Sequence, residues 1–166
     1  MTKEAFKAFV AEKVAEANNE PVDWEGQKKD WLFHLAQLNN RVTSWLTPYI
    51  TNHSVRLGQE MEPLVEENIG SYFAPMMTIT IGNDLVKLVP IGTLLIGARG
   101  RVDMTGPKGV ARLVIVPKNS TGPQVRVEPP PVSEWVWKLA SAPPKITFVE
   151  LTEESFLDAL MGVVNG

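Results

Sequence analysis

Apolar residues in the first third of the chain recur at spacings of three and four, which predicts two N-terminal helices. The first is capped by Thr2 and repeats apolar positions at Phe6, Val10, Val14 and Ala17. Residues 18–21 interrupt the pattern, and Asp23 is placed to cap a second helix. Its apolar stripe consists of Trp31, Leu35, Leu38, Val42 and Trp45. We expect this helix to end near Thr47, because proline disfavours helix in the residue before it.

After Tyr49 the pattern changes to short alternating runs, which are typical of strands with one buried face. Met77, Ile79 and Ile81 alternate with threonines, and a short turn at residues 82–84 leads to a second run, so this pair is antiparallel. Further strands are expected at residues 85–89, 91–96, 98–105, 110–116, 134–140 and 145–149, with a possible short strand at 124–127 in the proline-rich connection 117–131. Thr152 caps a final helix that turns Phe156, Leu157, Leu160 and Val163 inward.

Helices and strands are thus segregated along the chain, which predicts the α+β class. We expect residues 1–166 to form a single α+β domain, with two N-terminal helices, a long antiparallel β-meander sheet and a C-terminal helix. The helices are expected to pack on one face of the sheet. No internal repeat or domain boundary is visible.

Composition excludes several kinds of protein. The chain has no cysteine, so disulfides, thiolate nucleophiles and thiolate metal sites are excluded, and a reducing, cytoplasmic location is expected. A net charge of −3 argues against generic nucleic-acid binding. No export signal or membrane-spanning stretch is expected. Acidic residues 54–84 and basic residues 99–126 are expected to face each other as neighbouring strands.

Motifs for catalysis, metals and cofactors are missing, so we expect no metal, no cofactor and no catalytic residue, and an enzyme is the less favoured class. Only two histidines are present. His34 lies one turn after Asp30, a pair that by itself is weak evidence for a metal site. The carboxylates of Glu60, Glu62, Glu66 and Glu67 are expected to form a solvated acidic edge of the sheet.

The most informative stretch is the hairpin at residues 99–116, where Arg99, Arg101, Asp103 and Thr105 occupy alternate positions. A turn at residues 106–109 places Asp103 opposite Arg112 and predicts a cross-strand ion pair. The same turn pairs Thr105 with Val110, Arg101 with Val114 and Arg99 with Val116. The other face of the hairpin is then continuously apolar and consists of Val102, Met104, Ala111, Leu113 and Ile115. Arg99 and Arg101 are left to pair with Glu60 and Glu62, or with a carboxylate or phosphate of a ligand.

Trp135 and Trp137 share one face of their strand and either pack under the helices or form an exposed aromatic patch. The candidate ligand- or partner-binding residues are therefore Arg99, Arg101, His34, Trp135 and Trp137. The leading hypothesis is a non-catalytic module that binds a protein partner, as an adaptor, a chaperone-like factor or an immunity-type factor. The alternative is a small enzyme or anionic-ligand binder with a pocket between helices and sheet at Arg99 and Arg101. A homo-oligomer formed through the sheet is a third possibility.

Overall fold

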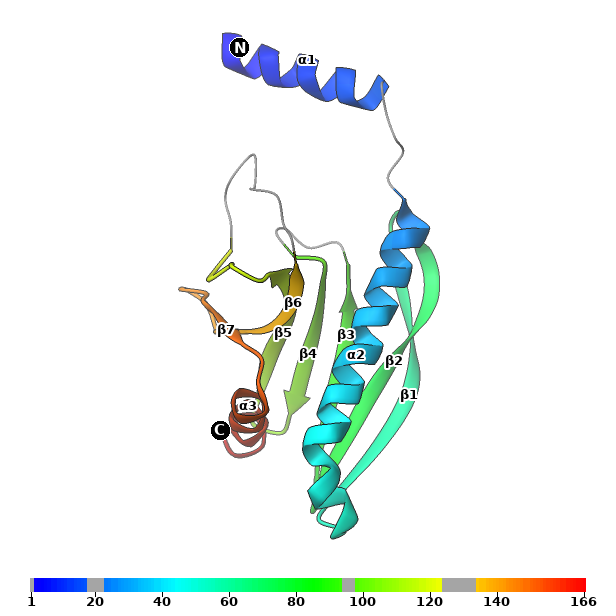
Figure 1. The fold of residues 1–166 in the computed structure, drawn as a ribbon, viewed down its shortest axis with the longest axis vertical. Coiled ribbons are helices and arrows are strands. Elements are labelled where there is room, and N and C mark those ends of the chain that lie inside the picture. Colours follow the sequence, from blue (N-terminus) through cyan, green and yellow to red (C-terminus); the bar gives the residue numbers. More distant parts are fainter. Residues whose placement is uncertain (1, 18–22, 94–97, 124–133) are drawn as a thin grey trace.

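The computed structural model describes residues 2–17, 23–93, 98–123 and 134–166, which form three helices and one seven-stranded antiparallel sheet (Figure 1). The helices are α1 (Lys3–Ala17), α2 (Trp24–Thr51) and α3 (Glu153–Asn165). The strands are β1 (Val55–Glu66), β2 (Gly70–Ile81), β3 (Asp84–Gly92), β4 (Gly100–Gly106), β5 (Gly109–Pro117), β6 (Trp135–Ala140) and β7 (Phe148–Glu150). The predicted α+β class and the antiparallel meander are confirmed.

The sheet follows chain order, since each strand pairs with the one before it. The longest pair is β1 with β2, two strands of 12 residues each. Met76 and Met77 are adjacent on β2 and both buried, although consecutive strand residues point to opposite faces. The hairpin therefore twists so strongly that a different face is covered in each half.

Several predicted strand boundaries differ from the structure. The strand predicted at residues 91–96 is wrong as a separate element, because β3 runs on to Gly92. The strand predicted at 145–149 is only the three-residue β7. Residues 94–97 and 124–133, which include the short strand predicted at 124–127, lie outside the described residues. The acidic and basic segments are not neighbours in the predicted way, since Glu60 and Glu62 lie on β1, which β2 and β3 separate from β4.

The core lies between the sheet and two helices. The apolar stripe predicted for α2 is buried from Trp31 to Val42. At its C-terminal end Leu46 is buried, whereas Trp45 is only partly buried. From α3, the buried residues are Phe156, Leu160 and Val163.

Two glycines of β4 allow the helices to approach this closely. A Cβ atom at Gly100 would lie 2.3 Å from the Trp31 ring of α2, and one at Gly106 would lie 2.4 Å from the Val163 carbonyl oxygen of α3. Gly100 and Gly106 have the same parity on β4 and therefore face the same side of the sheet.

Helix α1 differs from this arrangement, because it stands away from the sheet beyond the first turn of α2 (Figure 1). Its Phe6, Phe9 and Val10 side chains are 55%, 51% and 41% exposed. The prediction that the helices pack together on one face of the sheet is therefore not confirmed. The amphipathic spacing of α1 predicts one apolar face, but it does not determine whether that face is buried against the sheet or exposed to solvent.

Helix α2 also passes its predicted end at Thr47 and runs through Pro48 to Thr51. Proline removes one backbone hydrogen bond from the helix. The side-chain hydroxyls of Thr43, Thr47 and Thr51 each donate to the carbonyl four residues earlier, and Ile50 packs against the core. This extra turn carries Tyr49.

Candidate functional site

The hairpin singled out in the sequence has the predicted register. Asp103 is paired with Arg112, Arg101 with Val114 and Thr105 with Val110. The amide of Arg99, just before β4, donates to the Ile115 carbonyl. The apolar face is buried as expected, with Val102, Met104, Leu113 and Ile115 each at most 1% exposed.

The charge pairing on the opposite face differs from the prediction. The Arg101 guanidinium donates from Nε and Nη2 to the two Asp103 oxygens, at 2.7 and 2.8 Å. Hydrogen bonding to Asp103 raises the pKa of Arg101 above its already high ordinary value, so this side chain stays charged. The predicted pair between Asp103 and Arg112 is wrong, because the carboxylate is already held on both oxygens by a residue of its own strand.

The other candidate residues make internal contacts. The Arg99 guanidinium carbon lies 4.2 Å from the centre of the Trp135 ring, a cation–π contact. Trp137 is 2% exposed, packs against Trp31 and donates its indole N–H to the His34 carbonyl at 3.0 Å. The His34 Nδ1 atom is 2.7 Å from the Asp30 carbonyl oxygen. Arg99, Arg101 and His34 line neither of the two cavities described below.

These contacts predict that substitutions at Asp103 and Arg112 change the free energy of unfolding by different amounts. Asp103→Ala is expected to lower the free energy of unfolding by about 1 to 2 kcal/mol, because it removes two charge-assisted hydrogen bonds to a partly buried guanidinium. Arg112→Ala, directly opposite, should cost less than about 0.5 kcal/mol, since Arg112 holds no ion pair among the described residues. Urea unfolding of both variants checks this, and an equal loss from both would contradict the assigned pairing.

A buried carboxylate that the sequence did not single out lies where β1 ends. Glu66 is 8% exposed and accepts hydrogen bonds from three donors: the Tyr72 hydroxyl, and the Thr93 backbone N–H and hydroxyl at 2.7 and 2.8 Å. The expectation that Glu66 belongs to a solvated acidic edge is therefore wrong. Its position joins the end of the β1–β2 hairpin to the end of β3.

Tyr72 is the natural donor in this cluster. Burial first, and then the hydrogen bond to Glu66 and its negative charge, raise the pKa of the Tyr72 hydroxyl well above its ordinary value. The Trp31 indole N–H approaches the same hydroxyl and acts on its pKa in the opposite direction. Its geometry falls short of a full hydrogen bond, so this buried N–H has no partner among the described residues. The cluster is a structural tie, with Tyr72 protonated and Glu66 as the acceptor.

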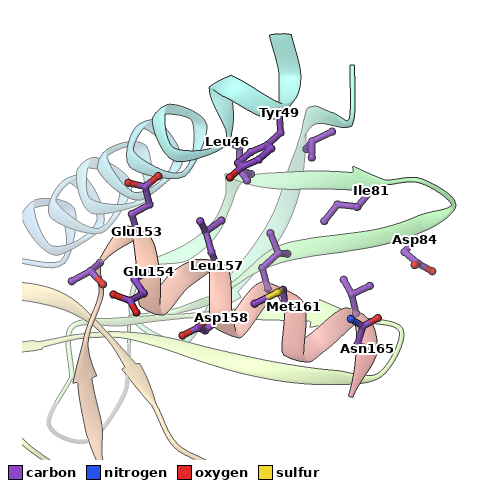
Figure 2. Close-up of a pocket in the computed structure, with 14 residues that line it drawn as sticks. Leu46, Tyr49, Ile81, Asp84, Glu153, Glu154, Leu157, Asp158, Met161 and Asn165 are labelled. Atoms are coloured by element: carbon purple, nitrogen blue, oxygen red, sulfur yellow. The ribbon is translucent and has the colours of Figure 1, made fainter. Parts of the chain in front are cut away.

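A groove of about 1080 Å³ lies between the C-terminal part of α2 and helix α3. Figure 2 shows Leu46 and Tyr49 of α2 on one side of it and Leu157 and Met161 of α3 on the other. The β2–β3 turn closes one end through Ile81 and Asp84. Tyr49 and Met161 are 41% and 57% exposed, so large apolar side chains face solvent inside the groove. This volume is at the upper end of the range of ligand-binding cavities.

Charge at the rim of this α2–α3 groove has a single sign. The rim carries the carboxylates of Asp84, Glu153, Glu154 and Asp158, and no lysine, arginine or histidine is among the described residues that line the groove. None of these four carboxylates belongs to an ion pair among the described residues. Glu153 and Glu154 also stabilise the N-terminus of α3, but Asp84 and Asp158 lie outside its first turn. The result is an apolar groove with an acidic rim.

The described part of the chain has no candidate metal site and no membrane-spanning helix. No group of three or more His, Asp or Glu side chains suited to a metal ion is present in the described part of the chain. The helices there are all too short or too polar to cross a bilayer. Comparisons with protein-family models, with curated proteins and with solved structures gave no match to this chain.

Proposed function

We propose that this protein is a non-catalytic protein-binding module whose α2–α3 groove accepts an amphipathic helix with lysine or arginine side chains beside its apolar face. The observation that carries the proposal is the pairing of exposed Tyr49 and Met161 with an all-acidic rim. A helix in a groove buries apolar anchors spaced by three or four residues. Basic residues next to these anchors would meet the rim carboxylates and speed the encounter.

Helix α1 of this chain is an example of the proposed ligand. Phe6 and Val10 lie one turn apart, and Lys3 and Lys13 are on the same side at helical spacing, whereas Glu4 lies on the opposite side. The apolar side chains are exposed. The groove of the same chain is distant from α1. Leu46, which lines the groove, follows Trp24 at the start of α2 by 22 residues, about 33 Å along the helix. A second copy of the chain is therefore the favoured donor of such a helix.

The absence of cysteine supports a cytoplasmic location for this module. The groove and not the hairpin at residues 99–116 is the proposed interaction site, because Arg101 is already held by Asp103 and Arg99 lies on Trp135.

The proposal is tested with a labelled synthetic peptide of residues 2–17, titrated into the full-length protein and followed by fluorescence anisotropy. The charge-reversed double variant Glu154→Lys, Asp158→Lys is expected to bind the peptide about tenfold more weakly, because both carboxylates line the groove. The control, Glu60→Lys, Glu62→Lys on edge strand β1, makes the same change in net charge away from the groove.

An equal loss of peptide affinity in both double variants would overturn the proposal, and so would the absence of peptide binding to the unaltered protein. Sedimentation of the full-length chain completes the test. Concentration-dependent dimerisation that the Phe6→Ser, Val10→Ser variant abolishes is the result expected if a second copy supplies the helix.

A further inference from the structure

A second, smaller cavity of about 240 Å³ lies where α2, β6 and β7 meet. It collects three cationic side chains from three elements: Arg41 of α2, Lys118 just after β5, and Lys138 of β6. The remaining lining residues are Val136, Trp137, Glu150 and Leu151. Strand β6 pairs with β5 along its whole length but with β7 only at Lys138–Ala140, so among the described residues no strand pairs with Trp135–Trp137 on the β7 side.

Lys138 is the unusual member of this cavity, because its side chain is buried at 8% exposure. Its ammonium donates to the Lys118 and Ser120 carbonyl oxygens, both at 2.7 Å. Glu150 is its register partner on β7, yet the two form no ion pair. An ammonium group has three N–H donors, so two neutral acceptors leave one donor for another partner.

Arg41 is fixed in place beside it. Its Nη2 donates to the Leu151 carbonyl at 2.8 Å, and its guanidinium carbon lies 5.0 Å from the centre of the Trp45 ring. These contacts orient the planar group and use one of its five N–H donors. Lys118 is 66% exposed at the side chain and forms an ion pair of 3.3 Å with Glu134. It is thus an exposed cation beside two that are held by hydrogen bonds to backbone carbonyls.

We infer that this cavity binds a phosphate group, either free or carried by a small molecule or side chain. An oriented guanidinium suits the paired oxygens of a phosphate, and two ammonium groups add the charge that a dianion requires. A phosphate fills only part of the volume, and Val136, Trp137 and Leu151 line space for whatever carries it. Glu150, the one carboxylate among the described lining residues, is exposed, and the three cations outnumber it. This site is separate from the groove and does not depend on the proposed function.

The test uses isothermal titration of the full-length protein at constant ionic strength, with inorganic phosphate, phosphoserine and acetate as probes. We expect phosphate to bind at least tenfold more tightly than acetate. Lys118→Ala and Arg41→Lys should each weaken phosphate binding several-fold, since the first removes a charge and the second removes the planar fork. The matched control is Lys145→Ala, an exposed lysine outside the cavity, which should leave binding unchanged.

The probes also distinguish the two sources of phosphate. Tighter binding of phosphoserine supports a carried phosphate group, and equal or weaker binding supports the free ion. Equal affinity for phosphate and acetate, or equal losses in Lys145→Ala and the cavity variants, would overturn the inference and leave Lys138 as a tie for the backbone at Lys118 and Ser120. Circular dichroism of each variant separates loss of the site from loss of the fold.

Discussion

Trp31→Ala is expected to lower the free energy of unfolding by about 3 to 5 kcal/mol, because it empties the largest position in the core. Trp31 is 1% exposed and lies against the backbone at Gly100 and the ring of Trp137. Gly100 has no side chain that could fill the space. Chemical denaturation monitored by far-ultraviolet circular dichroism measures the loss.

The matched control is Phe33→Ala, two residues away on the same helix, where the ring is 66% exposed. This substitution should change stability by no more than about 0.5 kcal/mol. A loss at Phe33 as large as the loss at Trp31 would contradict the assigned inner face of α2.

Glu66→Ala is the second substitution with a large expected effect. It removes one acceptor from three donors, the Tyr72 hydroxyl and both donors of Thr93, and leaves them buried without partners. Each unpaired buried donor costs about 1 to 3 kcal/mol, and water entering the space recovers part of it. We expect a net loss of about 3 kcal/mol, measured by the same denaturation experiment.

Glu67→Ala is the control for this prediction, because Glu67 is the next residue and is exposed. A change within about 0.5 kcal/mol is expected there. If Glu66→Ala were equally mild, the carboxylate would not be the tie between the β1–β2 hairpin and β3.

Local periodicity was sufficient to predict the central features of the fold. The buried stripe of α2, the capped helix α3 and the register of the β4–β5 hairpin all follow from spacings within about ten residues. The bounds of β1 and the first half of β2 were not predicted, because the buried face of β2 changes sides at Met76 and Met77 and no single alternating pattern runs along it.

The candidate sites depended on longer-range contacts and were harder to predict. The groove joins Tyr49 to α3 across about a hundred residues of sequence, and Tyr49 lies in the helical turn beyond Pro48 that the sequence argued against. Lys138 gave no signal at all, since a lysine in a strand is ordinarily exposed. The place of Glu66 at a strand end could have suggested a special role. Its hydrogen-bond donors, Tyr72 and Thr93, come from two other segments of the chain.

The most direct measurement of the groove's role is the footprint of the residue 2–17 peptide on the isotopically labelled full-length protein, mapped by chemical-shift perturbation. The groove account predicts the largest shifts on α3 at Leu157, Met161 and Asn165 and at Tyr49 of α2. A competing apolar surface is formed by Met61, Val65 and Phe73 on the β1–β2 hairpin, which are 54%, 78% and 62% exposed. Shifts confined to that hairpin, with α3 unchanged at saturating peptide, would contradict the assignment of the groove as the binding site.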